Sequence, residues 1–366
     1  MIKNKQKKIN VIYLLPALKG ASGGAKVIYN QSSILNSLKN NLSSKILHLK
    51  KSKYYKLKLS LQKKLKLSGQ NYSGWDGRQM AAAKNFSPSN FWVDKNISNK
   101  NDINFDKDSD FIILPEIWSH FAVDLNLISK KIKYSIFVQG FYHMNSTSNF
   151  EKIKKAYENS EFIMTDSKYS IQYILNMFPK CKNKIIRLNF SIDSKKFKKR
   201  TKKNLITYMP RKLQDHSILL NFYIKNILPK KWKIIPLVNL NEVELNKKLS
   251  ESKIFLSFSN LEGIGMPPIE AALAGNIVIG YIGGGGSEYW KKPIFNKVEH
   301  GEIKSFGDLI IKSIKNYNKS WITKTKTERI KLSNQYSVKK EISSIRLLEK
   351  KIKNCLNNKF ILKKNR

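Results

Sequence analysis

The sequence has few cysteines and no long apolar run. Its two cysteines, Cys181 and Cys355, have neither the spacing of metal ligands nor the pattern of a disulfide framework, so we expect a protein of a reducing compartment. No stretch of about 18 apolar residues occurs, so no membrane-spanning helix is expected. Hydrophobic residues make up 41% of the chain, which is enough for a packed core without disulfides or metals.

Acidic residues and arginine are also scarce. The chain has 26 acidic against 69 basic residues, a formal net charge of +43, and only seven of the basic residues are arginine. Because arginine is the common reader of base edges, the lysine excess argues against sequence-specific nucleic-acid binding. Two interpretations of the charge stay open. It is either the composition of an A- and T-rich genome, or a positive field that attracts phosphorylated donors, nucleic acid or an anionic membrane face.

The start of the chain, residues 1–25, superficially resembles a signal peptide, with basic, then apolar, then small residues. However, Pro16 interrupts the apolar run and Lys19 follows at once. We therefore expect a buried first strand that enters a glycine turn, and a cytoplasmic protein.

Strand and helix patterns alternate along the chain, which predicts an α/β protein with parallel sheets. The length favours two domains. Runs typical of buried strands lie at 9–16, 44–49, 110–116, 134–140, 161–166 and 184–190, and again at 205–210, 231–238, 253–258 and 276–282. Helical spacing is found at 27–38, 167–178, 217–228, 242–252 and 322–354.

A polar, basic stretch without periodicity, 191–203, is predicted to link the two halves. The predicted organisation is a first domain at 1–190, a second at 204–325, and C-terminal helices at 326–366. Two doubly wound domains hold ligands at the carboxyl ends of their strands, so residues that follow strands are the candidates for function.

One such stretch is NLEGIGMPPIEAALAG, residues 260–275. Glu262 directly follows a predicted strand, and Gly263 and Gly265 permit positive φ and close backbone approach to a ligand. Glu270 is expected in the first turn of the helix that follows, where its carboxylate can accept hydrogen bonds from vicinal hydroxyls. The helix start is expected to point amides at a phosphate. An ordinary loop acid and a capping carboxylate explain the two glutamates equally well.

The combination E-G-x-G-x-P-x-x-E-A, with seven residues between Glu262 and Glu270, resembles the EX7E signature of retaining GT-B glycosyltransferases of the "group 1" type, also called family four. Weaker similarity extends over most of the chain, in 15–30, 161–179, 185–197 and 281–290. The resemblance implies the GT-B fold, with two Rossmann-like doubly wound domains facing a central cleft. It also implies C-terminal helices that cross back to the first domain.

The resemblance also implies roles on the donor side. Arg211 and Lys212 would clamp the diphosphate, although the family often has the lysine several residues later. Glu262 would contact sugar hydroxyls and Glu270 the ribose. Backbone amides of a glycine loop would approach donor oxygens. The loop consists of Gly284, Gly285 and Gly286, and its run of glycines is hard to explain by packing.

On the acceptor side, Gly23 and Gly24 would open a helix near the acceptor and the donor phosphates. Gln139 or His143 would replace a family histidine that touches the donor sugar. A solvated loop histidine is the alternative for His143 and for His120. No metal and no cofactor are expected. The aspartate pair in "DSD", 108–110, which elsewhere holds manganese, is better interpreted as a solvated turn at the wrong end of its strand.

The predicted function is metal-independent, retaining transfer of a sugar from a nucleoside-diphosphate-sugar to a glycan or lipid-linked acceptor, in cell-surface polysaccharide or lipopolysaccharide biosynthesis. Two alternatives stay open: a sugar-nucleotide epimerase of the same fold, and a basic polyanion-binding protein on a GT-B scaffold. The lysine-rich segment 48–67 is either a partly buried segment or a face for peripheral contact with an anionic membrane. No specific nucleic-acid partner is expected.

Overall fold

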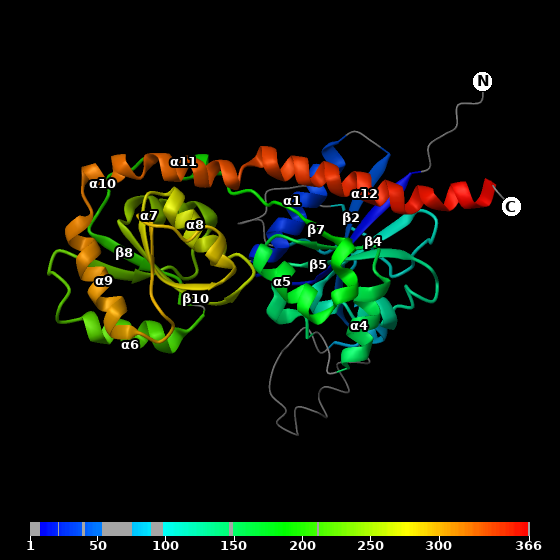
Figure 1. Ribbon diagram of the computed structural model, residues 1–366, viewed down its shortest axis with the longest axis horizontal. Helices are drawn as coiled ribbons and strands as arrows, with labels where there is room; N and C mark the ends of the chain where they lie inside the picture. Colours follow the sequence, from blue (N-terminus) through cyan, green and yellow to red (C-terminus); the bar gives the residue numbers. More distant parts are fainter. Residues whose placement is uncertain are drawn as a thin grey trace. The chain divides into compact units, whose positions relative to one another are not determined.

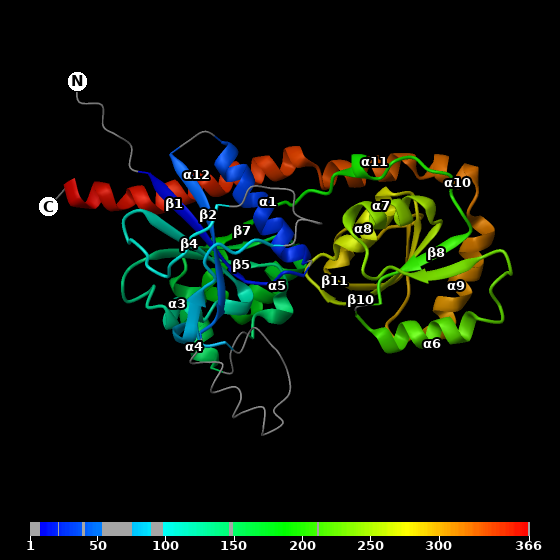
Figure 2. The ribbon, with the colours of Figure 1, turned by 180° about the vertical axis from the view of Figure 1, so that it is seen from behind.

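The computed structural model describes residues 8–20, 22–38, 41–52, 75–88, 98–145, 149–210 and 212–364. The described chain forms two compact units (Figures 1 and 2). The first comprises residues up to Asp166, Ser170–Leu188, and the residues from Ile342 onward, and the second comprises Ser167–Tyr169 and Asn189–Glu341. The stretch predicted as a linker, 191–203, lies in the second unit.

The first unit is built on a seven-stranded sheet in the order β3-β2-β1-β4-β5-β6-β7. Its strands are β1 (Ile9–Pro16), β2 (Leu42–Lys51), β3 (Met80–Ala82), β4 (Asp110–Pro115), β5 (Lys133–Val138), β6 (Phe162–Thr165) and β7 (Ile185–Arg187). All neighbours pair in parallel except β3, which adds an antiparallel edge. Because helices cover both faces of a parallel sheet, β4 is buried along its whole length.

The helices of the first unit connect these strands. They are α1 (Gly23–Ser37), α3 (Phe121–Asp124), α4 (Phe150–Asn159) and α5 (Lys168–Met177), with short 3-10 turns η2 (Gly77–Gln79), η3 (Glu116–Trp118), η4 (Phe141–His143) and η5 (Pro179–Lys184). The sheet order changes direction between β1 and β4, so the carboxyl ends of these strands form the expected ligand crevice of the unit.

The second unit contains a five-stranded, wholly parallel sheet in the order β12-β11-β10-β8-β9. Its strands are β8 (Leu205–Tyr208), β9 (Lys233–Pro236), β10 (Ile254–Glu262), β11 (Ile277–Gly284) and β12 (Phe295–Lys297). This order is that of a doubly wound fold whose switch point lies between β8 and β10.

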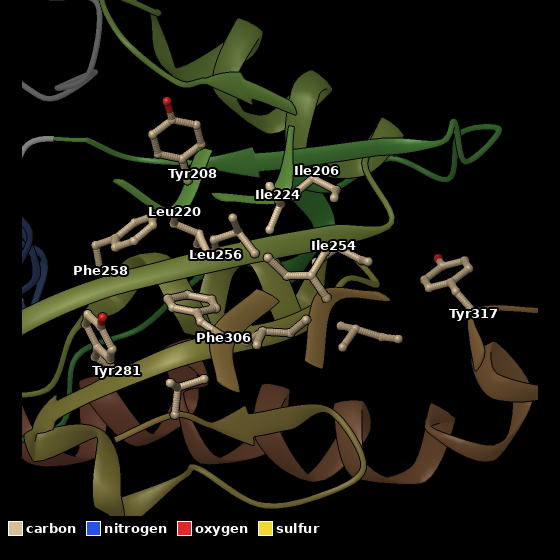
Figure 3. Close-up of a cluster of buried hydrophobic side chains, with 14 residues drawn as sticks. Ile206, Tyr208, Leu220, Ile224, Ile254, Leu256, Phe258, Tyr281, Phe306 and Tyr317 are labelled. Atoms are coloured by element: carbon tan, nitrogen blue, oxygen red, sulfur yellow. The ribbon is translucent and has the colours of Figure 1, made fainter. Parts of the chain in front are cut away.

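Helices α6 (Gln214–Ile224) and α9 (Ile303–Asn316) pack against each other on one face of the second sheet, and α7 (Glu242–Glu251) and α8 (Met266–Leu273) pack on the other (Figures 1 and 2). The unit also contains α10 (Lys319–Lys324) and α11 (Lys326–Gln335), and the 3-10 turns η6 (Ser194–Lys196) and η7 (Gly285–Glu288). Leu220 and Ile224 of α6 and Phe306 of α9 join the strand side chains in one buried cluster (Figure 3).

The last helix, α12 (Val338–Lys364), is shared between the units. Its residues up to Glu341 belong to the second unit and those from Ile342 onward to the first. Within the described part of the chain, no helix combines the length and the apolar character needed to cross a membrane.

Candidate active site

The switch point of the second sheet brings a lysine and a glutamate together. Lys212 follows β8, and Glu262 is the last residue of the neighbouring strand β10. The Lys212 ammonium lies 2.7 Å from the Glu262 carboxylate and donates a hydrogen bond of 2.9 Å to the Leu261 carbonyl. Both side chains are partly exposed, 27% and 21%, so the pair is open to solvent and to a ligand. Arg211, the other predicted clamp residue, lies outside the described residues.

The turn after Glu262 is held by a buried tyrosine. Gly265 has φ +77° and serves as the N-cap of α8, a conformation that needs glycine. The hydroxyl of Tyr289 lies 3.1 Å from the Ile264 carbonyl and 2.8 Å from the Gly265 carbonyl, and donates its proton to them. Burial raises the pKa of Tyr289 well above its usual range, so the hydroxyl stays protonated. Sequence reasoning missed this residue, whose only signal is an aromatic after the glycine run.

The position of Glu270 differs from the prediction. Helix α8 begins at Met266 and has no acidic residue in its first turn, so Glu270 is the fifth helical residue and is half-buried. Pro267 and Pro268 in the first turn of α8 carry no N–H and so cannot donate to a ligand. The remaining donors of the turn are the amides of Met266 and Ile269.

The carboxyl end of α8 is anchored twice. Gly275 (φ +87°) and Asn276 donate their amides to the carbonyls of Ala272 and Ala271, the pattern of a Schellman motif. In addition, Lys202 inserts between the ends of two helices.

The ammonium of Lys202 donates to the carbonyls of Ala274, just after α8, and Ser252, just after α7, at 2.7 Å each, and it lies 3.4 Å from the Leu249 carbonyl. Burial lowers the pKa of Lys202 to about 7. A residue of the predicted linker thus holds the helix that carries Glu270.

The run of glycines has a packing explanation, contrary to the sequence-based argument. A Cβ on Gly285 would lie 1.5 Å from the carbonyl oxygen of Gly263, so the two loops touch backbone to backbone. A Cβ on Gly286 would lie 2.9 Å from Ile282, and Gly284 has φ +86°. Glu262 pairs with Gly284 in the sheet, so the glycine loop lies beside the predicted catalytic carboxylate.

In the first unit, the structure brings Gln139 and Gly24 together. The Gln139 side-chain amide, just after β5, donates to the Gly24 carbonyl at 3.1 Å. A Cβ on Gly24 would lie 2.9 Å from the Gln139 oxygen, so a larger residue at this position would displace the end of the Gln139 side chain. Gly23 is the first residue of α1, whose N-cap Ser22 accepts from the Ala25 amide.

The two histidine candidates and Asp110 of "DSD" each contact neighbouring residues of the first unit. His143 ends η4 and its ring stacks at a tilt on Tyr142, with centroids 4.3 Å apart. His120 is buried rather than solvated, and its ring contacts the Trp75 carbonyl. Asp110 is buried rather than solvated, and accepts from the Asn10 side chain at 2.8 Å and from the Asp106 amide at 3.0 Å.

A buried glutamate lies beneath Gln139. Glu116 directly follows β4 and accepts a hydrogen bond of 2.9 Å from the Gly140 amide. Burial raises the pKa of Glu116 to about 7, against the lowering effect of the backbone amides of Glu116, Gln139 and Gly140. Its signal in the sequence is an acid at the end of the apolar run "DFIILPE". Glu116 can therefore change charge near neutral pH directly under the loop that carries Gln139.

By sequence, the chain matches no family model and no curated protein. By structure, it is similar to a glycosyltransferase from Rickettsia africae, with a TM-score of 0.63 and 14% identity over 95% of this chain and 99% of that one. It is also similar to HepE from Anabaena in complex with UDP-glucose (TM-score 0.63, 10% identity, 93% and 99% covered). A third similar structure is TarM from S. aureus, in complex with UDP and α-GlcNAc-glycerol among its ligands (TM-score 0.62, 12% identity, 95% and 100% covered). The chain therefore has the GT-B fold of these proteins, with two Rossmann-like α/β units, as the sequence predicts.

Proposed function

We propose that the chain transfers a sugar from a nucleoside-diphosphate-sugar to an acceptor hydroxyl, with retention at the anomeric carbon and without a metal ion. The observation that carries the proposal is the Lys212–Glu262 pair at the switch point of the second sheet, where doubly wound folds bind their ligands. The similarity in fold to glycosyltransferases supports it.

The chemistry needs positive charge at the leaving diphosphate and polar contacts to the sugar. Lys212 would supply charge to the diphosphate, together with Arg211 beside it in the sequence. A bound diphosphate would compete with Glu262 for the Lys212 ammonium, which lies 2.7 Å from that carboxylate. The Glu262 carboxylate would then be available to sugar hydroxyls. Donor binding and the placing of the sugar would thus be linked through one ion pair.

The remaining roles are proposed from the resemblance. Glu270 would accept hydrogen bonds from the ribose, and the amides of the glycine loop would bind donor oxygens. Gln139, at the carboxyl end of β5, would contact the donor sugar, and His143 is the alternative to Gln139. Gly23 and Gly24 would open α1 near the acceptor and the donor phosphates. UDP-sugars are the first donors to test, because HepE and TarM have been solved with UDP or UDP-glucose.

The proposed acceptor is a glycan or a lipid-linked glycan of cell-surface polysaccharide or lipopolysaccharide biosynthesis. The proposed location is the cytoplasm, with peripheral contact to an anionic membrane face. The segment predicted for this contact, 48–67, lies outside the described residues from position 53 onward.

Thermal shift of the purified protein against a panel of nucleoside diphosphates and nucleotide-sugars tests the proposal. A donor at 100 times its Kd stabilises the folded protein by about 2.7 kcal/mol. Glu262→Gln and Glu270→Ala should lower this stabilisation for the sugar-nucleotide. Glu242→Gln is the matched control, because Glu242 forms a similar ion pair with Lys196, also at 2.7 Å, on the surface of the same unit.

The rival function is polyanion binding, which the net charge of +43 favours. It predicts no stabilisation by any nucleotide, and salt-dependent binding of nucleic acid that Glu262→Gln leaves unchanged. An epimerase would instead convert the nucleotide-sugar into an isomer without any acceptor, which chromatography of the products detects.

A further inference from the structure

Helix α6 has large apolar side chains on its outward face as well as on its inward face. Leu220 and Ile224 are buried in the core of the second unit (Figure 3). On the opposite side, Phe222 is 78% exposed, Ile218 61% and Leu219 54%. A helix that is apolar all round is normally covered on all sides, and a contiguous apolar patch marks a contact surface.

The exposed side chains lie on one face of the helix. At 3.6 residues per turn, Ile218 and Phe222 lie one above the other and Leu219 lies beside them. Tyr223, at the edge of this face, packs toward α9, where a Cβ on Gly307 would lie 2.7 Å from its ring. We call Ile218, Leu219 and Phe222 the α6 patch.

Lysines border the α6 patch. A groove of about 630 Å³ separates α6 from the start of α9, and its lining consists of Leu219, Phe222, Tyr223, Lys225, Asn226, Ile303 and Lys304. Lys304 also forms an ion pair of 3.0 Å with Asp308. Lys230 and Lys231 follow the helix in the sequence and are exposed. The surface therefore combines projecting apolar side chains with ammonium groups at their margin.

We infer that the α6 patch contacts the surface of an anionic phospholipid membrane. Helices that lie in the membrane interface place aromatic and aliphatic side chains below the head groups and lysines beside the phosphates. Lys225 lies about one helical turn from Phe222. In one lipid leaflet, Phe222 can therefore contact the acyl chains while the Lys225 ammonium contacts the phosphates.

The other occupants fit the surface less well. A second copy of the chain would bring the lysine margins of two molecules together, each molecule with a net charge of +43. An amphipathic helix of a partner protein docks its apolar anchors into an apolar groove. The groove between α6 and α9 is lined in part by Lys225, Asn226 and Lys304, and Phe222 is 78% exposed. A lipid surface has no fixed shape and accommodates projecting side chains.

This contact is independent of the donor site and of the segment 48–67. The α6 patch consists of residues that follow the clamp residues in the chain but point away from the sheet, so its substitution leaves the Lys212–Glu262 pair in place. Membrane binding and donor binding are accordingly separate measurements, and either proposal can fail without the other.

Co-sedimentation of the full chain with vesicles tests the inference. Vesicles of mixed phosphatidylglycerol and phosphatidylcholine should bind the protein, and pure phosphatidylcholine vesicles should bind it much less. The double variant Leu219→Gln/Phe222→Gln should weaken binding to the anionic vesicles about tenfold or more, because two large side chains no longer leave water. Lys225→Glu should weaken binding most at low salt, where the lysine charge is least screened.

Val243→Gln is the matched control, since Val243 is also 78% exposed but lies on α7, on the opposite face of the sheet. Its binding should equal that of the unchanged protein. Three results would overturn the inference. The first is no preference for anionic vesicles, and the second is equal binding by the double variant. The third is a dimer, detected by light scattering, that Leu219→Gln/Phe222→Gln dissociates, because a second copy would then cover the patch.

Discussion

Lys202 anchors the carboxyl end of α8, and its removal should destabilise the second unit by a measurable amount. Lys202→Met keeps the aliphatic stem and removes the amine. The carbonyls of Ser252 and Ala274 then lose donors at 2.7 Å, whereas the Leu249 carbonyl keeps the Asn276 side-chain amide at 2.8 Å. A buried polar group without a partner costs about 1–3 kcal/mol, so two carbonyls cost about 2–6 kcal/mol.

The variant has no ammonium to bury, so the desolvation cost of this group disappears and offsets part of the loss. We therefore expect the free energy of unfolding to fall by about 2–4 kcal/mol. Urea unfolding of both proteins measures it. A loss below about 0.5 kcal/mol, as is common for surface substitutions, would refute the anchoring role.

The pKa of Lys202 adds a pH dependence to this difference. Burial lowers the folded-state pKa from 10.5 to about 7, so between these values the unfolded chain binds more protons than the folded chain. The contribution of Lys202 to stability is therefore complete above pH 10.5 and falls as the pH drops toward 7. The destabilisation caused by Lys202→Met should grow as the pH rises from 7, by up to about 1.4 kcal/mol per pH unit. A difference that stays constant from pH 7 to 9.5 would show that the amine remains charged throughout.

Three further substitutions have specific expected outcomes. Lys212→Ala should weaken UDP binding about 10- to 150-fold, the equivalent of one charge-assisted hydrogen bond, and change the free energy of unfolding by less than about 1 kcal/mol. Calorimetric titration measures the UDP affinity, with Lys196→Ala as the control. An equal loss of affinity in the two variants would contradict the role of Lys212. Tyr289→Phe should cost about 1–2 kcal/mol in urea unfolding and weaken donor binding by loosening the loop before α8, and unchanged stability would remove Tyr289 from that role. The pKa of Glu116, raised from 4.5 to about 7, means that its contribution to stability is complete below pH 4.5 and is lost as the pH rises through 7. Glu116→Gln should abolish this loss, so parallel pH profiles of the two proteins would contradict the assignment.

Much of the fold follows from periodicity in the sequence. The first strand, at 9–16, has its predicted bounds because a strand buried on both faces is a continuous apolar run. The strands at 253–258 and 276–282 are longer in the structure, reaching Glu262 and Gly284. Glycine and glutamate are poor strand formers, so a prediction from local propensity ends these strands earlier than the pairing in the sheet does.

Other elements carry too little local signal. β3 and β12 have three residues each, and β3 makes an antiparallel edge that the alternating pattern does not predict. Helix α6 starts three residues before the predicted 217, because its N-cap Leu213 adopts the left-handed conformation, and it ends at Ile224. The ends of α6 are also hard to predict from the sequence, because a helix with apolar residues on two faces has no clear hydrophobic periodicity.

The candidate site shows the same division between local and long-range information. The sequence singled out Lys212 and Glu262 separately, and their contact depends on the pairing of β8 with β10. Tyr289 and Lys202 act on the loop and helix between the two glutamates from positions distant in the chain. Such contacts depend on the tertiary fold, and no spacing rule in a single sequence indicates them.

The measurement that tests the central claim most directly is proton NMR of the sugar transferred from, or hydrolysed off, the donor that the thermal-shift panel identifies, recorded with chelator present. We expect release of the nucleoside diphosphate and a product whose anomeric configuration is that of the donor. Inversion at the anomeric carbon would contradict retention, and activity that requires added manganese would contradict metal independence. No turnover of any donor by the folded protein would contradict the assignment as a glycosyltransferase.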